Sequence, residues 1–256
     1  MKMDSISIIS FRYHAKYGHF RKPYSNVSSL SYPFPPRTAL AGLLGAVLGV
    51  PKAEVPLKFD ERNLRVAVEI EKPIKTITHV TNLRQDSAGG IDYSIKRSRK
   101  IKQTELKNIP DWNKAALIPQ EILRRPSYLI YINLRDNMSE LVSRIKNKRS
   151  VYTPCMGLSG FLAELDYISE GTGQPLDPRQ YDVSTVADKD YCSLSLDWLN
   201  EAEEDRHILE VIAPYLGTPD RRFTYKRYLL NMLSKPLPLR MTDNIYRFNN
   251  KIISFL

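Results

Sequence analysis

Residues 32–49 read Tyr-Pro-Phe-Pro-Pro-Arg-Thr-Ala-Leu-Ala-Gly-Leu-Leu-Gly-Ala-Val-Leu-Gly. The prolines keep the first residues extended and place a proline near the first helical turn, where its missing N–H costs nothing. Apolar residues at helical spacing then predict a buried helix from Ala39 to Gly49. Gly42 and Gly45 each weaken such a helix by about 1 kcal/mol, which is tolerable where another backbone packs closely against them.

Two polar residues, Arg37 and Thr38, stand at the front of this predicted helix. The free backbone N–H groups and the positive end of the helix dipole make a helix start a place to hold a phosphate. We therefore expect Arg37 and Thr38 to contact a phosphate. A buried helix with Arg37 as an incidental surface charge explains the apolar residues equally well.

The segment before the helix, residues 11–23, interleaves aromatic and cationic side chains. This mixture suits RNA, because bases stack on aromatic rings while lysine and arginine meet phosphates. Tyr17 is the best candidate for base stacking. The residues expected to line the RNA surface here are Arg12, His14, Lys16, Tyr17, His19, Arg21 and Lys22.

Two motifs resemble a known family. The first is Phe-Arg-Lys-Pro at residues 20–23, followed by Ser-Tyr-Pro-Phe-Pro-Pro-Arg-Thr at residues 31–38 and the glycine-containing helix. It resembles the small RAMP-superfamily subunit of type I CRISPR Cascade that caps the 5′ handle of the crRNA. The second, Tyr-Thr-Pro-Cys-Met-Gly-Leu-Ser-Gly-Phe-Leu-Ala at residues 152–163, is similar to the family's Gly-Leu-Ser-x-Phe-Leu-Ala segment. Gly160 departs from the acidic residue that is commoner there.

The resemblance implies a non-catalytic subunit that binds crRNA. Its partners would be the backbone RAMP subunits, the large subunit and, through the assembled complex, target DNA. No cofactor or metal is expected. Two alternatives remain open: a metal-independent endoribonuclease that processes pre-crRNA, and a basic scaffold whose charge serves protein assembly.

Composition is that of an ordinary globular protein. The chain has 256 residues, of which 42% are apolar and 26% charged. No apolar run approaches the roughly 18 residues of a membrane span, and the start lacks the apolar part of a secretory signal. Cys155 and Cys192 are too far apart in sequence for a metal motif and are expected to be ordinary thiols. These features predict a cytoplasmic protein without a membrane partner.

The charge is strongly positive and unevenly distributed. The net charge of +10 and the pI near 9.5 favour a polyanionic partner. Residues 221–256 carry a net charge of +7, whereas residues 188–210 carry −6. Such segregation suggests one face for nucleic acid and another for solvent or a protein neighbour.

The order of predicted elements defines the expected fold. Strands at 5–13, 64–70 and 128–134 and two helices give two strand–helix–strand units, the second helix starting at Asn137 with Glu140 as its capping-box partner. The fourth strand would begin at Val151. This order is the split βαβ arrangement of an α+β, ferredoxin-like (RRM-like, RAMP) fold, taken as a single domain over residues 1–256.

Further expectations concern the remaining segments. Residues 171–178 contain glycines and prolines and are expected to form a surface loop. A strand is expected at 207–213, and the basic C-terminal segment, about 215–256, has the spacing of two or three short strands.

An insertion at about residues 75–125 separates the two units. A connection of that length in a compact domain is usually functional or disordered. Gly89-Gly90 and the alternation that follows predict a basic hairpin over 88–102, similar in position to the family's RNA-contacting thumb; the alternative is a solvated loop. Its cations are Lys96, Arg97, Arg99, Lys100 and Lys102.

The ribonuclease alternative rests on residue types alone. None of the four histidines has metal-ligand spacing with a cysteine or carboxylate. RNA cleavage without metal needs a general base, a general acid and a cation beside the phosphate. His14 or His19 with Tyr13, Tyr17, Lys16 or Lys22 could supply these groups.

Overall fold

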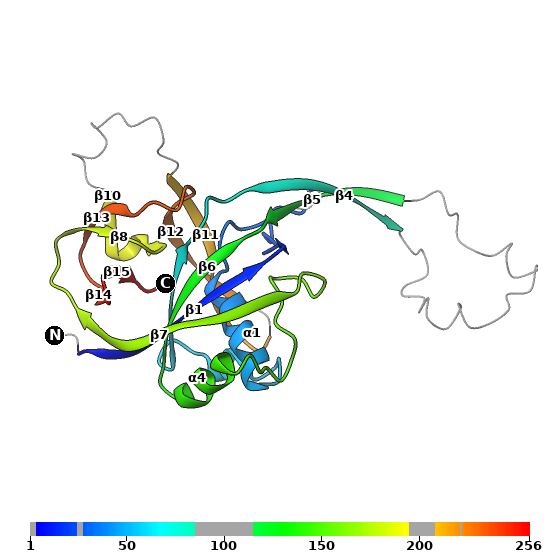
Figure 1. Ribbon diagram of the computed structural model, residues 1–256. Coiled ribbons are helices and arrows are strands. Elements are labelled where there is room, and N and C mark those ends of the chain that lie inside the picture. Colours follow the sequence, from blue (N-terminus) through cyan, green and yellow to red (C-terminus); the bar gives the residue numbers. More distant parts are fainter. Residues whose placement is uncertain (1–3, 25–27, 85–114, 195–207, 221) are drawn as a thin grey trace, which may run out of the picture.

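The structure is a computed structural model that describes residues 4–24, 28–84, 115–194, 208–220 and 222–256. Most of it is β-structure (Figure 1). The helices are α1 (Arg37–Leu48), α2 (Val55–Lys58), α4 (Met138–Lys146) and a short 3₁₀ turn, η2 (Lys189–Tyr191). The N-terminal strands are β1 (Ile6–Ala15), β2 (Tyr17–Gly18), β3 (Leu64–Ile70), β4 (Thr76–Arg84), β5 (Ala115–Arg124), β6 (Ser127–Leu134) and β7 (Ala163–Pro175).

The remaining strands belong to the C-terminal part. They are β8 (Gln180–Val183), β9 (Ala187–Asp188), β10 (Cys192–Leu194), β11 (Ile208–Gly217), β12 (Phe223–Asn231), β13 (Leu237–Met241), β14 (Ile245–Phe248) and β15 (Lys251–Ser254).

A six-stranded sheet in the order β15-β14-β7-β1-β6-β3 forms the centre of the molecule. Strands β1 and β3 flank β6, and α1 connects β1 to β3, while α4 connects β6 to β7. All neighbouring strands in this sheet pair antiparallel. The predicted strands at 5–13, 64–70 and 128–134 are thereby confirmed.

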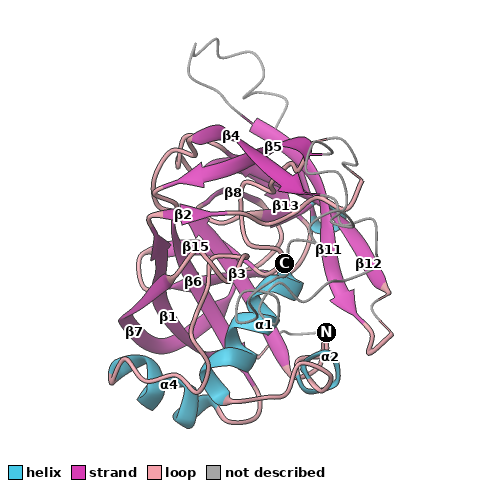
Figure 2. Ribbon diagram, turned by 90° about the vertical axis from the view of Figure 1, so that its right-hand side faces the viewer, coloured by secondary structure: helices cyan, strands magenta, loops and turns pink. Residues whose placement is uncertain are grey.

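Helices α1 and α4 cover one face of this sheet (Figure 2). Alternate residues of β1 point to that face, and Phe11 and Tyr13 pack there with Leu44 of α1 and Leu141 of α4. Each of these side chains is at most 2% exposed. The apolar side chains that recur every 3.6 residues in the helices therefore pack against those that recur every two residues in β1, in one apolar layer.

The opposite face is covered only in part. At one end, Ile8 and Tyr131 pack against the C-terminal strands and Phe255, and the Tyr131 and Phe248 rings meet edge-on at 5.8 Å. At the other end the face carries polar side chains. Residues 8–11 of β1 are thus buried on both sides of the sheet, which explains why Ile8 and Ile9 are both apolar.

Three sequence expectations about the second unit are wrong. Residues 171–175 are not a loop but the end of β7, which starts at Ala163 rather than Val151. Gly173 allows β7 to lie close to β1, because an added Cβ there would stand 2.4 Å from Ile8 Cδ1. There is no capping box on α4, where Asn137 makes no side-chain cap and Glu140 pairs with Arg144.

Strands β4 and β5 pair along their whole length and extend away from the sheet as an arm (Figure 1). The base of the arm is widened by β2, which pairs with the end of β5. The arm falls within the predicted insertion at 75–125, whereas the hairpin expected at 88–102 lies outside the described residues.

Four strands, rather than two or three, follow residue 220. They complete two small sheets, β10-β13-β8 and β11-β12-β9, and add β14 and β15 to the main sheet. The predicted strand at 207–213 is confirmed as β11.

The two glycines of α1 differ in their surroundings, and this gives a first prediction. A Cβ on Gly45 would lie 2.8 Å from Cγ2 of Val55, whereas a Cβ on exposed Gly42 would meet nothing within 4 Å. Gly42→Ala should therefore raise the free energy of unfolding by about 1 kcal/mol through helix propensity alone. Gly45→Ala should lower it, because α2 must move. Urea unfolding of both variants checks this, and equal shifts would contradict the packing described.

Candidate nucleic-acid interface

The two motifs that carry the family resemblance lie against each other in the structure. The backbone N–H of His19 donates to the carbonyl of Met156 at 3.0 Å, and buried Met156 packs beneath Gly18. A Cβ on Gly18 would stand 2.4 Å from Met156 Cγ. The loop between α4 and β7 is thereby fixed beside β2.

Gly157 gives a second prediction at this junction. Its φ of +86° is rare for residues with a side chain, and an added Cβ would stand 1.9 Å from the carbonyl oxygen of His19. Gly157→Ala should lower the free energy of unfolding by about 2 kcal/mol, combining backbone strain with the forced separation of the two segments.

The matched control is Gly160→Ala in the same loop, where an added Cβ would meet nothing within 4 Å. Thermal unfolding of both variants measures the difference. A Gly157 variant as stable as the Gly160 variant would show that the contact with His19 is not needed.

Four cations meet at the base of the arm. The backbone N–H of Arg125 donates to the carbonyl of Lys16, and that of Arg124 donates to the carbonyl of Lys75. All four side chains are exposed, and no carboxylate in the described residues lies within ion-pair distance of them. We call Lys16, Lys75, Arg124 and Arg125 the arm-base cations. Their unneutralised charge creates a positive potential at this corner.

An aromatic side chain borders this cluster. Tyr17 lies opposite Arg124 in the β2–β5 ladder, and its half-buried ring stands 6.2 Å from that of Phe161. Lys16 Nζ lies 5.7 Å from the Tyr17 ring. The structure thus brings together the ring and one of the cations expected from residues 11–23.

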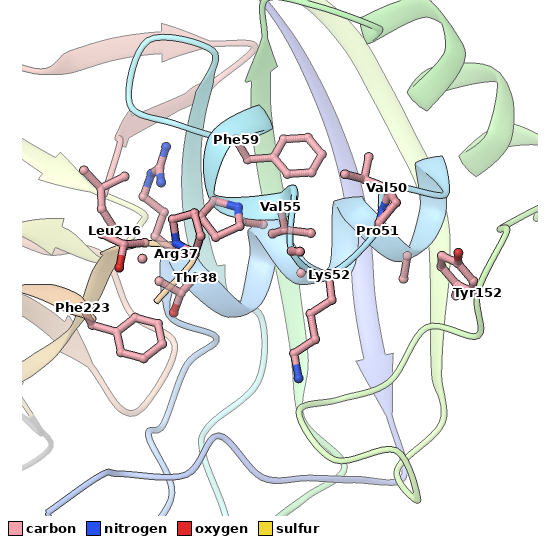
Figure 3. Close-up of a pocket in the computed structure, with 18 residues that line it drawn as sticks. Arg37, Thr38, Val50, Pro51, Lys52, Val55, Phe59, Tyr152, Leu216 and Phe223 are labelled. Atoms are coloured by element: carbon pink, nitrogen blue, oxygen red, sulfur yellow. The ribbon is translucent and has the colours of Figure 1, made fainter. Parts of the chain in front are cut away.

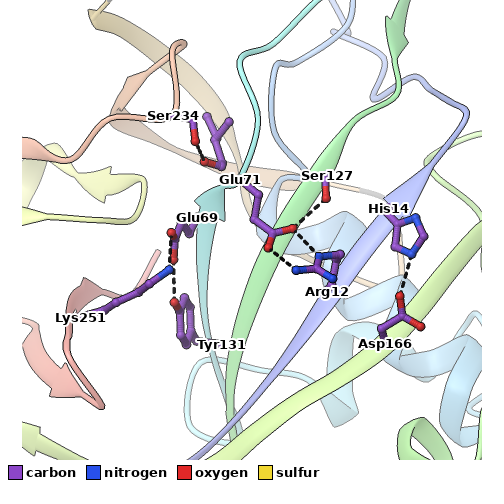
Figure 4. A network of polar contacts seen from close by, with 10 residues as sticks. Arg12, His14, Glu69, Glu71, Ser127, Tyr131, Asp166, Ser234 and Lys251 are labelled. Atoms are coloured by element: carbon purple, nitrogen blue, oxygen red, sulfur yellow. Dashed lines mark hydrogen bonds and ion pairs between the residues drawn. The ribbon is translucent and has the colours of Figure 1, made fainter.

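Arg12 and His14 lie on the polar end of the open sheet face, where each has a carboxylate partner (Figure 4). Arg12 donates to both carboxylate oxygens of Glu71 at 2.8 and 2.9 Å. Burial alone would raise the pKa of the Glu71 carboxyl, but hydrogen bonds from Arg12 and Ser127 outweigh it and hold the pKa below its usual range. His14 Nε2 lies 2.9 Å from Asp166.

Lys148 also reaches Asp166, at 2.9 Å. The hydrogen bond from Lys148, followed by that from His14, lowers the pKa of the Asp166 carboxyl. The open sheet face is therefore electrically balanced, and a polyanion meets less net charge there than at the arm base.

His19 is not on the surface, contrary to expectation. It is 2% exposed, and its Nδ1 and Nε2 lie 2.7 Å from the carbonyl of Glu121 and 3.0 Å from the Ser29 hydroxyl. Burial lowers its pKa, which favours the neutral ring. With both ring nitrogens engaged, His19 fixes the base of the arm instead of meeting RNA or acting as a general base.

Arg37 is also buried, so the expectation of a phosphate-binding side chain is wrong. It is 2% exposed, and Nη2 donates to the carbonyls of Asp60 at 2.7 Å and Leu64 at 2.8 Å. Its guanidinium carbon lies 5.1 Å from the centre of the Tyr215 ring. Burial lowers the pKa of Arg37. Thr38, half-buried, lines a groove described below.

Of the other expected cations that the structure describes, some are exposed and others contact a ring or a carboxylate. Arg21 is exposed beside β5, and Lys22 lies 5.7 Å from the Tyr32 ring. In the basic C-terminal segment, Lys226 pairs with Asp188 at 2.7 Å and Lys251 with Glu69 at 2.6 Å. The cations expected in the hairpin, Lys96, Arg97, Arg99, Lys100 and Lys102, lie outside the described residues.

Sequence reasoning missed Lys75, Arg124 and Arg125. The available signal was the Arg124-Arg125-Pro126 sequence at the return from the insertion, where the proline marks a strand boundary. Arg125 has a φ of 50°, so the chain turns sharply there, beside Lys16. Only the pairing of β2 with β5 places these residues together.

Known proteins resemble part of this chain in sequence. Residues 8–123, from β1 to the end of the arm, match the family described as CRISPR-associated protein (Cas_Cas5). This match agrees with the resemblance to the RAMP-superfamily Cascade subunit that the sequence motifs indicate. No curated protein matches the chain significantly.

Solved structures resemble this chain over most of its length. A chain of a CRISPR RNA-guided surveillance complex is 14% identical, with 90% of this chain and 91% of that chain covered and a TM-score of 0.51. A CRISPR protein from Archaeoglobus fulgidus is 11% identical, with 97% and 98% covered and a TM-score of 0.53. At these identities the likeness is one of fold.

No helix in the described part of the chain is long and apolar enough to cross a membrane. The described residues also contain no group of three or more histidine, cysteine or acidic side chains positioned to hold a metal ion.

Proposed function

We propose that the chain is a non-catalytic subunit of a type I Cascade complex that binds crRNA at its 5′ handle. The observation that carries this proposal is the arm-base cations, four exposed charges without carboxylate partners among the described residues, next to the Tyr17 ring. Positive charge beside an aromatic ring is the arrangement that binds single-stranded RNA. The likeness to a surveillance-complex chain supports the assignment to such an assembly.

The finer fold assignment belongs to the same proposal. The order β7-β1-β6-β3 with α1 and α4 on one face is the arrangement expected of a ferredoxin-like, RRM-like RAMP domain. We assign residues 1–256 to one such domain, with β4 and β5 as the stem of its inserted hairpin. Backbone RAMP subunits, the large subunit and, through the complex, target DNA are its proposed partners, in the cytoplasm.

RNA in this account lies on the arm base rather than on the open sheet face. On the sheet face Arg12 and His14 already have carboxylate partners, and displacing Glu71 or Asp166 would cost part of the RNA-binding energy. At the arm base no such displacement is needed. The ion pairs of the sheet face thus bias a polyanion toward the arm.

Variants of Tyr17 test the stacking part of this proposal. Stacking of a base on an aromatic ring is worth about 1–3 kcal/mol, so Tyr17→Ala should weaken binding of a handle-bearing crRNA roughly 5- to 150-fold. Tyr17→Phe keeps the ring and should bind nearly as well as the wild type. Fluorescence anisotropy with a labelled crRNA measures both. Equal losses in the two variants would point to the hydroxyl and contradict stacking.

The ribonuclease alternative makes a different prediction for the same proteins. Incubation with repeat RNA without metal should leave the RNA intact if the chain only binds it. A defined cut, abolished in His14→Ala but not in Tyr17→Phe, would instead support an enzyme that uses half-buried His14 rather than buried His19.

A further inference from the structure

We propose that a groove between α1, α2 and the end of the β11–β12 hairpin binds an apolar segment of a partner protein that carries a carboxylate. The groove has a volume of about 730 Å³ and lies beside Arg37 and Thr38 (Figure 3). Its position on the helix side separates it from the arm-base cations. The proposal therefore stands independently of RNA binding.

The lining of the groove is mainly aliphatic. Ala41, Val55, Pro56 and Leu216 contribute to its walls, and Phe223 stands at one side. Aliphatic walls match the apolar side chains of a protein segment, whereas a nucleotide needs flat stacking surfaces and cations. A protein occupant is thus favoured over RNA.

Apolar side chains also stand exposed around the opening. Phe223 and Tyr152, both in the lining, are 46% and 54% exposed. Single exposed apolar residues are ordinary, but here they gather beside an apolar groove, which is typical of a protein interaction site.

Gly42 supplies a second, independent observation. It lies in the middle of α1, lines the groove and is exposed, and nothing within the described chain lies within 4 Å of the place its Cβ would take. Glycine at such a position destabilises a helix, and no contact among the described residues requires it. A partner backbone that approaches α1 closely would account for the absent side chain.

Charge defines the chemistry of the occupant. Lys52 and Arg37 are the two charged residues of the lining, and the Arg37 guanidinium is committed to backbone carbonyls. Lys52 is exposed, belongs to the lining (Figure 3), and pairs with no carboxylate of the described residues. An acidic side chain at the edge of the bound segment would complement it.

The first step of the test identifies the occupant. Benzoylphenylalanine is placed at position 42 of the full chain, the chain is irradiated in its assembled complex, and cross-linked peptides are sequenced. We expect a partner segment with bulky apolar residues and a neighbouring aspartate or glutamate. The control carries benzoylphenylalanine at exposed Ser139 of α4 instead. Cross-links to RNA or to a second copy of this chain would overturn the proposal. So would a yield of protein cross-links no higher than in the control.

The second step uses the identified segment as a synthetic peptide. Gly42→Gln should raise the melting temperature of the chain yet weaken peptide binding at least tenfold, because the new side chain fills the groove. Lys52→Glu should weaken binding, and a peptide with lysine in place of its acid should restore it. The matched control Ser139→Gln should leave binding unchanged. Unchanged affinity in Gly42→Gln with the melting temperature raised would overturn the proposal.

Discussion

Arg37→Ala is expected to lower the free energy of unfolding by about 3 kcal/mol while leaving the RNA affinity of the folded protein unchanged. The buried guanidinium donates two short hydrogen bonds, to Asp60 and Leu64, and a charge-assisted hydrogen bond contributes at least about 1.5 kcal/mol. These bonds hold the turn after α2 against the start of α1. The loss should therefore appear in stability.

The matched control is Arg62→Ala, which removes an exposed arginine close to the same turn. It should change stability by no more than about 0.5 kcal/mol. Urea unfolding measures the stability of each variant, and titration of the folded variants with RNA measures their affinity. Together they separate a structural role of Arg37 from a role in RNA binding. A stable Arg37 variant with weakened RNA binding would restore the phosphate-binding hypothesis and contradict the buried network.

The largest effect on RNA binding is expected from the arm-base cations. Replacing Lys16, Lys75, Arg124 and Arg125 together by glutamine should weaken crRNA binding on the order of 100-fold at physiological salt, about 2.8 kcal/mol. All four side chains are exposed, so the fold should tolerate the change. Because cations in such a cluster meet phosphates, the loss should be the same for unrelated guide sequences.

The regular elements could be predicted because their patterns depend on neighbours in sequence. The helical repeat of α1 and the alternation of β3 each show which face is buried, and the structure confirms both. The glycines and proline at 171–175 predicted a loop, yet Gly173 serves close packing of β7 on β1. A local turn signal cannot reveal that a long-range contact requires the missing side chain.

The candidate site was only partly predictable for the same reason. Tyr17 and Lys16 could be identified as an aromatic and a cation in sequence, but Arg124 and Arg125 reach them only through strand pairing. The position of Arg37 at a helix start favours a phosphate contact, but the structure buries its guanidinium against backbone carbonyls. Its partners, Asp60, Leu64 and Tyr215, come from distant segments and are not apparent in the local sequence.

The most direct test of the central claim is the salt dependence of crRNA affinity for wild type and the four-fold arm-base variant. The control replaces four other exposed arginines, Arg62, Arg135, Arg240 and Arg247, by glutamine and changes the net charge equally. Each phosphate contact to single-stranded RNA contributes about 0.7 to the slope of log affinity against log salt. We predict a slope shallower by about 3 in the arm-base variant and nearly unchanged in the control. Equal slopes in the two variants would contradict an RNA site at the base of the arm.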